Sequence, residues 1–199
     1  MKTKPSPINY ILVTDSATEP LSLAEVKTYL RIDGTDYDNI LTPLIKKVRQ
    51  LAEKITGRDF INKTWKTYLD YFPDDCEGVE LRKSKLQSIT HIKYYASSVL
   101  TTLSSAVYYN TDESFYSSIY VVDGQTYPVS DDIKQSVVIT FVSGYGSSST
   151  DVPQALRQAM LSHIAYLFEN TGDCGDQGVS QFQEMYAPYI VPQKMILFI

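Results

Sequence analysis

The side chains best suited to chemistry are few and lie far apart in the sequence. Residues 74–77 read Asp-Asp-Cys-Glu, and Asp131-Asp132 forms a second acidic pair. Carboxylates can hold a divalent cation, but neither segment has the alternating ligand spacing of a calcium-binding loop. We therefore expect solvated acidic turns, without a metal ion, at both places.

The two histidines do not complete a reactive constellation either. His163 falls on the apolar face of a predicted helix, where a buried or helix-contacting histidine is the ordinary outcome. His91 lies in a predicted strand and has no acidic or nucleophilic neighbour in the sequence. The GxGxxG, GxxxxGK[ST], GxSxG and HExxH signatures of phosphate, nucleophile and zinc sites are missing. The sequence thus predicts no catalytic residue, no cofactor and no enzymatic activity.

Composition is that of an ordinary globular protein. Of 199 residues, 43% are hydrophobic and 21% are charged, and the net charge of −5 argues against a general nucleic-acid binder. Cys76 and Cys174 have no CxxC partner, so we expect two free thiols in a reducing compartment. No run approaches the ~18 apolar residues of a membrane span, and residues 1–10 lack the apolar segment of a signal peptide. No membrane association is expected.

A long amphipathic helix over Asp36–Arg58 organises the chain. Its apolar residues recur at steps of three, four and one, which places them on one stripe: Ile40, Leu41, Leu44, Ile45, Val48, Leu51, Ala52 and Ile55. Asp36 or Asp38 is expected to cap its start, and Gly57 is expected to cap its end. The opposite face, which is expected to be exposed to solvent, carries Lys46, Lys47, Arg49, Glu53 and Lys54. A helix with one apolar face needs partners, and the sequence supplies two.

Proline and capping residues define the helix starts. Pro43 either kinks a continuous organising helix, which the stripe favours, or occupies the first helical position after Thr42. Ser22 and Glu25 have the spacing of a capping box and open an earlier helix that ends near residue 31. Asp151–Pro153 opens a third helix, with proline in the first turn. Its expected buried face consists of Ala155, Leu156, Ala159, Met160, His163, Ile164 and Leu167.

Between the second and third helices the pattern changes to short alternating segments. Strands are expected over Ile61–Asp70, Val79–Leu81, Ile89–Tyr95, Ala106–Asn110, Ser118–Val122 and Ser136–Val142. Before the first helix, Tyr10–Val13 is expected to be extended and able to pair as an edge strand. A short helical segment over Gln181–Tyr186 is expected near the end.

The predicted fold class is α+β: a small bundle of three main helices with an inserted antiparallel β-region and an extended C-terminal tail. The expected organisation is an N-terminal arm over 1–19, a helical core from 20–58 and 151–190, the β-region over 59–150, and an apolar tail over 191–199.

Two groups of residues are candidates for contacts between subunits or with a partner. From Lys46 to Lys66, seven basic residues stand against two acidic ones. The basic candidates are Lys46, Lys47, Arg49, Lys54 and Arg58. The second group is the apolar chain end, where the candidates are Ile196, Leu197, Phe198 and Ile199. The alternative for this end is a final strand packed on its own domain.

Several short sequence motifs resemble, in the same order along the chain, motifs of the head–tail connector (adaptor) proteins of tailed bacteriophages. They are Pro20–Arg31 (PLSLAEVKTYLR), Ile55–Arg58 with Ile61 and Thr64-Trp65, Leu86–Ile89, Ser143–Gly146, Val152–Ala159, Tyr166–Asn170 and, more weakly, Tyr186–Tyr189. Pro43 inside the helix and the long serine- and tyrosine-rich β-region depart from the family pattern.

The resemblance implies a structural virion protein at the head–tail interface, made in the host cytoplasm. Such adaptors form a ring, commonly dodecameric, beneath the portal protein and bind the next neck or tail protein. Packaged DNA passes through the lumen without sequence-specific binding. The residues themselves leave another function open: the sixteen tyrosines also suit a carbohydrate- or receptor-binding β module of a phage particle. An enzyme of unrecognised type is the third possibility, and almost nothing in the sequence favours it.

Overall fold

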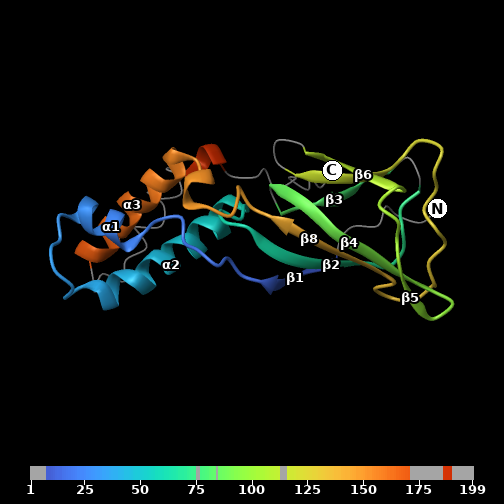
Figure 1. Ribbon diagram of the computed structural model, residues 1–199, viewed down its shortest axis with the longest axis horizontal. Coiled ribbons are helices and arrows are strands. Elements are labelled where there is room, and N and C mark those ends of the chain that lie inside the picture. Colours follow the sequence, from blue (N-terminus) through green and yellow to red (C-terminus); the bar gives the residue numbers. More distant parts are fainter. Residues whose placement is uncertain (1–7, 75–76, 84, 113–115, 171–185, 190–199) are drawn as a thin grey trace, which may run out of the picture. The chain divides into compact units, whose positions relative to one another are not determined.

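The structure is a computed structural model that describes residues 8–74, 77–83, 85–112, 116–170 and 186–189. The chain forms two compact units. The β unit comprises Met1–Asp15 and Asn62–Gly144, and the helical unit comprises Ser16–Ile61 and Tyr145–Ile199. Three α-helices and two antiparallel sheets, seen in Figure 1, confirm the predicted α+β class.

The described residues of the helical unit form three α-helices and two short 3-10 helices. Their bounds are α1 Leu23–Leu30, α2 Asp38–Thr56, η1 Ser149–Asp151, α3 Gln154–Glu169 and η2 Ala187–Tyr189. The buried core of this unit contains Leu21, Val26, Leu41, Ile45, Val48, Ala52, Phe60, Ile61, Val152, Leu156, Ala159, Met160, Ile164 and Tyr186. Burying each large apolar side chain contributes about 1.5–3 kcal/mol, so the shared core holds the helices together. Among the described helices, none combines the length and apolar character needed to cross a membrane.

The predicted helix caps at two ends are confirmed. Ser22 Oγ accepts a hydrogen bond from the Glu25 amide at 3.2 Å, and the Ser22 amide donates to Glu25 Oε2 at 2.9 Å, which completes the capping box. At the end of α2, Gly57 adopts a φ of 70° and its amide donates to the Glu53 carbonyl at 2.9 Å. Glycine reaches this left-handed conformation without steric cost.

The start of α2 differs from the prediction in two respects. The helix does continue through Pro43, as the stripe favoured. Its N-cap, however, is Tyr37, which makes no side-chain capping bond. Asp38 is instead the first residue of the helix, and its carboxylate pairs with Lys27 Nζ at 2.7 Å. Ile40, predicted on the buried stripe, is 49% exposed because it lies at the edge of the stripe in the first turn.

The start of α3 also differs slightly. Pro153 is the N-cap of α3, one position before the first turn in which it was expected. The preceding turn η1 has its own capping box, in which Ser148 Oγ accepts from the Thr150 amide and the Ser148 amide donates to Asp151. Ala155, predicted on the buried face of α3, is exposed because it lies in the first turn.

The β unit contains two antiparallel sheets. The strands are β1 Ile8–Thr14, β2 Lys63–Leu69, β3 Val79–Leu81, β4 Leu86–Ala96, β5 Val99–Thr102, β6 Tyr108–Asp112, β7 Ser117–Val121 and β8 Val137–Ser143. The larger sheet has the order β1-β2-β8-β4-β5, and the smaller one has the order β3-β7-β6.

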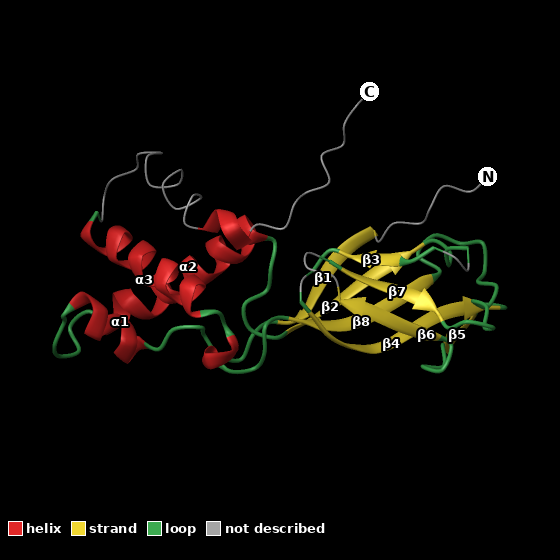
Figure 2. Cartoon of the chain, turned by 90° about the horizontal axis from the view of Figure 1, so that it is seen from above, coloured by secondary structure: helices red, strands yellow, loops and turns green. Residues whose placement is uncertain are grey.

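The two sheets pack face to face, as Figures 1 and 2 show. Their shared core contains Leu69, Val79, Leu81, Leu86, Ile92, Leu103, Ile119, Val137, Ile139 and Phe141. Tyr10 of the edge strand β1 reaches this core and contacts the Phe141 ring edge-on at 6.3 Å. One face of the five-stranded sheet is therefore covered by the three-stranded sheet.

A glycine closes the β unit at the end of β8. Gly144 has a φ of 144°, and a Cβ built on it would lie 2.7 Å from the backbone nitrogen of Asn62. No larger residue fits this approach of two backbones. The close backbone approach therefore explains the glycine at position 144 in the Ser143–Gly146 motif.

Candidate functional site

Three lysines form an exposed basic face on α2. Lys46, Lys47 and Lys54 are all exposed, as the sequence predicted, and the described residues provide no ion-pair partner for any of them. Since each carries a full charge into solvent, this lysine face can attract an acidic surface over about one Debye length, ~8–10 Å at physiological salt.

Arg49 and Arg58 do not belong to that face, and the expectation that they contribute to it is corrected. Both are buried, Arg49 with only 1% of its surface exposed. Arg49 Nε donates to Glu19 Oε2 at 2.7 Å, and its Nη1 donates to Glu53 Oε2 at 3.1 Å. Arg49 lies beside the buried Val48 on the helix surface, and its guanidinium is buried too. Carboxylates compensate the buried charge.

Glu53 extends this buried network toward the end of the helix. The sequence placed Glu53 on the solvent face, but the structure buries it. Its Oε1 accepts the Phe60 amide at 3.0 Å while its Oε2 accepts Arg49. The Arg49–Glu53 pair therefore holds the segment that follows α2 in place. These two residues stabilise the fold of the subunit itself and are not available for a contact between subunits.

Acidic side chains gather at one end of the helical unit. Asp33 and Asp36 are exposed in the connection between α1 and α2, and Glu169 is exposed at the end of α3. Tyr37 and Phe168 bring these two segments together through an edge-on ring contact at 5.3 Å. The helical unit thus presents a basic helix face and a separate acidic end.

The second predicted group, Ile196, Leu197, Phe198 and Ile199, lies outside the described residues. So do both cysteines and the segment Gln181–Met185.

No cluster of metal ligands appears in the part of the chain that the structure describes. Asp74 is exposed at the start of its acidic turn, and the Asp131 carboxylate accepts backbone amides. His163 is buried in the helical unit, as expected for a histidine packed on the apolar face of a helix, and its ring centroid lies 6.2 Å from that of Tyr186. His91 lies in β4.

The burial of His163 leads to a pH-dependent stability. Burial, with a smaller contribution from the charge of Lys47, lowers the pKa of His163 from 6.5 to about 4. Below pH 6.5 His163 binds a proton in the unfolded chain but not in the folded chain. The free energy of unfolding therefore falls as the pH falls. We expect a slope of up to about 1.4 kcal/mol per pH unit between pH 6.5 and 5.

His163→Gln should remove most of that slope in urea titrations at pH 6.5 and 5. His91→Gln, at a half-buried strand position, is the matched control and should change the slope less. An unchanged slope in His163→Gln contradicts the assignment.

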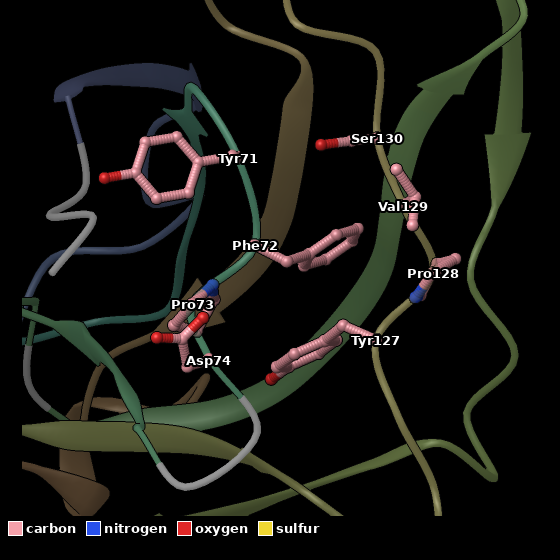
Figure 3. Close-up of a pocket in the computed structure, with 8 residues that line it drawn as sticks. All are labelled: Tyr71, Phe72, Pro73, Asp74, Tyr127, Pro128, Val129 and Ser130. Atoms are coloured by element: carbon pink, nitrogen blue, oxygen red, sulfur yellow. The ribbon is translucent and has the colours of Figure 1, made fainter. Parts of the chain in front are cut away.

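The β unit contains an open pocket of about 370 Å³ that the sequence did not predict. Its lining residues, shown in Figure 3, are Tyr71, Phe72, Pro73, Asp74, Tyr127, Pro128, Val129 and Ser130. The Phe72 and Tyr127 rings stack on each other at 4.6 Å, and Tyr94 contacts Phe72 at 5.6 Å. The stacked faces of Phe72 and Tyr127 are not open to a sugar ring, so this pair gives the carbohydrate-binding alternative no specific support. The alternating strand pattern gave no sign of this pocket because it is formed by two loops.

Comparisons with known proteins point to one family. A family model described as Phage gp6-like head-tail connector protein matches residues 20–126, more than half of the chain. No curated protein matches at a significant level.

Several solved structures share the fold. A chain from the neck of an empty gene transfer agent (GTA) particle, computed with C6 symmetry, is 18% identical with a TM-score of 0.76. A chain from the virion of the native GTA particle is 19% identical with a TM-score of 0.74. A chain from the neck of the native particle, computed with C12 symmetry, is 19% identical with a TM-score of 0.72. Each match covers 94% of this chain and 97% of the other.

Proposed function

This chain belongs to the Phage gp6-like head-tail connector protein family, and from that premise we propose that it is a ring-forming adaptor beneath the portal. It is a structural protein of the virion that connects head and tail. In the proposal, identical copies form a ring that binds the portal protein on one side and a neck or tail protein on the other. Packaged DNA passes through the lumen without sequence-specific binding, and the chain performs no catalysis.

The family match over residues 20–126 carries this proposal. The similar solved chains add support, because two of them come from particle necks computed with C6 and C12 symmetry. Both symmetries are compatible with a closed ring, and we propose a ring of twelve copies of this chain.

A ring of identical copies needs two different, complementary surfaces on each copy, because its contacts are head-to-tail. The helical unit offers such a pair. Lys46, Lys47 and Lys54 form the lysine face of α2, and the exposed acids of the α1–α2 connection are Asp33 and Asp36. We assign the contact between neighbouring helical units to these two surfaces. The apolar residues 196–199 remain a proposed contact with a neighbouring copy or the portal.

Reversing the lysine face tests this assignment. The triple variant Lys46→Glu, Lys47→Glu, Lys54→Glu should remain folded but lose most of the ring fraction in sedimentation velocity at low salt. A matched triple reversal at exposed β-unit positions, Arg82→Glu, Lys85→Glu, Lys134→Glu, should assemble nearly as the parent does. Raising the salt should weaken the parent ring, because exposed charge pairs are screened. Equal assembly of the two triple variants contradicts the lysine-face contact.

A further inference from the structure

The outer face of the five-stranded sheet has the composition of a covered surface. β8, the central strand, reads Val-Val-Ile-Thr-Phe-Val-Ser. Such a nearly continuous apolar run is typical of a strand that is buried on both faces. The three-stranded sheet covers the face of Val137, Ile139 and Phe141. Val138 and Val142 point to the other face, and neither belongs to a core cluster of the described residues.

This outer face is also basic. Strand register places two rows across it, Lys66–Thr140–His91 and Tyr68–Val138–Lys93. Among the strands that the structure describes, two lysines and no acidic side chain lie on this face. Burial, and to a smaller extent the charges of Lys93 and Lys66, lowers the pKa of His91 below 6.5. The two lysines therefore lie near His91 on this face. The outer face therefore suits a partner with apolar and acidic side chains.

The loop of residues 129–133 has that complementary chemistry. Val129 is 91% exposed and Ile133 is 50% exposed, and Asp132 between them is exposed too. The loop is held firmly: Asp131 Oδ1 accepts the Ser97 amide at 2.8 Å and Oδ2 accepts the Ser98 amide at 2.7 Å. Figure 3 shows Val129 and Ser130 among the residues that line the aromatic pocket, so one end of the loop borders that pocket.

The surroundings of the loop strengthen the charge contrast. Asp70 accepts the Gln135 amide at 2.8 Å and thereby joins the end of β2 to this region, and Asp74 lines the adjoining pocket. Lys134 is the nearest opposing charge in the sequence. An acidic, apolar loop and a basic, apolar face thus belong to the same folded unit.

We propose that in the assembled ring the 129–133 loop of one copy docks on the outer sheet face of the next, with Val129 against Val138 and Asp132 between Lys66 and Lys93. Two unlike surfaces on one chain generate the head-to-tail contact that a ring requires. The inference rests on the proposed ring and adds a second contact, through the β unit, to the contact between helical units. Rigid presentation of the loop favours binding, because little conformational entropy remains to be lost.

Site-specific cross-linking tests the contact directly. In a background with Cys76→Ser and Cys174→Ser, one preparation carries Val129→Cys and a second, tagged preparation carries Val138→Cys. The two are mixed under ring-forming conditions and treated with a short bismaleimide. A covalent pair that contains one tagged and one untagged chain is expected. The matched control replaces Val138→Cys with Tyr109→Cys, an exposed position on the three-stranded sheet, and should give several-fold less of the pair.

Charge exchange separates a specific contact from chance proximity. Lys66→Glu with Lys93→Glu in the tagged chain should lower the yield of the 129–138 pair by about fivefold at low salt, the upper range for exposed ion pairs. Adding Asp132→Lys to the Val129→Cys chain should restore most of that yield. A general folding defect cannot be rescued by a change in the other chain.

The outcomes distinguish this inference from the proposed function. Rings that form but give no more of the 129–138 pair than of the 129–109 pair overturn the loop contact and leave the adaptor function standing. A high yield without charge rescue overturns the assigned role of Lys66, Lys93 and Asp132. A protein that forms no ring, alone or with portal, overturns the adaptor proposal and this inference with it.

Discussion

Replacing Glu53 with alanine is expected to lower the free energy of unfolding by about 3–5 kcal/mol, the cost of breaking a buried ion pair from one side. Glu53 accepts hydrogen bonds from Arg49 and from the Phe60 amide, and Arg49 is 1% exposed. The substitution removes one carboxylate from a guanidinium that water cannot reach. It also leaves a buried amide without its acceptor.

Urea denaturation of the parent and the variant measures this effect. Lys54→Ala is the matched control, because Lys54 is the next residue on the same helix and is exposed. It should stay within about 0.5 kcal/mol of the parent, as surface substitutions usually do. A loss below about 1 kcal/mol in Glu53→Ala contradicts a structural role for the buried pair.

The β unit should respond as strongly to Phe141→Ala, with an expected loss of about 3–5 kcal/mol. Phe141 is fully buried, faces the three-stranded sheet and contacts the Tyr10 ring. Removing its ring leaves a cavity between two sheets, which cannot close without shifting paired strands. Phe141→Leu keeps much of the volume and should cost clearly less.

Trp65 provides a local measurement of this loss. It is the only tryptophan of the chain and pairs directly with Phe141 in the β2–β8 register. Its fluorescence during urea denaturation therefore reports on the β unit. Equal midpoints for Phe141→Ala and Phe141→Leu contradict the packing described for this core.

Local signals in the sequence were sufficient for most of the fold. The Ser22 capping box and the Gly57 cap were predictable because each depends on residues within one helical turn. The strand over Val79–Leu81 was predicted with its observed bounds. In contrast, β5 was not predicted, because its four residues Val99–Thr102 are all exposed and lack an alternating pattern.

The candidate surfaces were harder to predict because they depend on tertiary contacts. Helical periodicity placed Arg49 and Glu53 on the solvent face, because charged residues are assigned to the exposed side when the apolar stripe defines the buried one. Only the fold reveals that Glu19, distant in sequence, meets Arg49. The basic outer sheet face likewise depends on register between β2, β8 and β4, which a single strand does not specify.

Negative-stain electron microscopy of the purified chain, free and mixed with its portal protein, tests the adaptor function most directly. We expect closed rings with a central channel that stack on one side of the portal, and stain-filled channels that remain continuous through both proteins. A chain that stays monomeric at high concentration and leaves the portal unoccupied contradicts it.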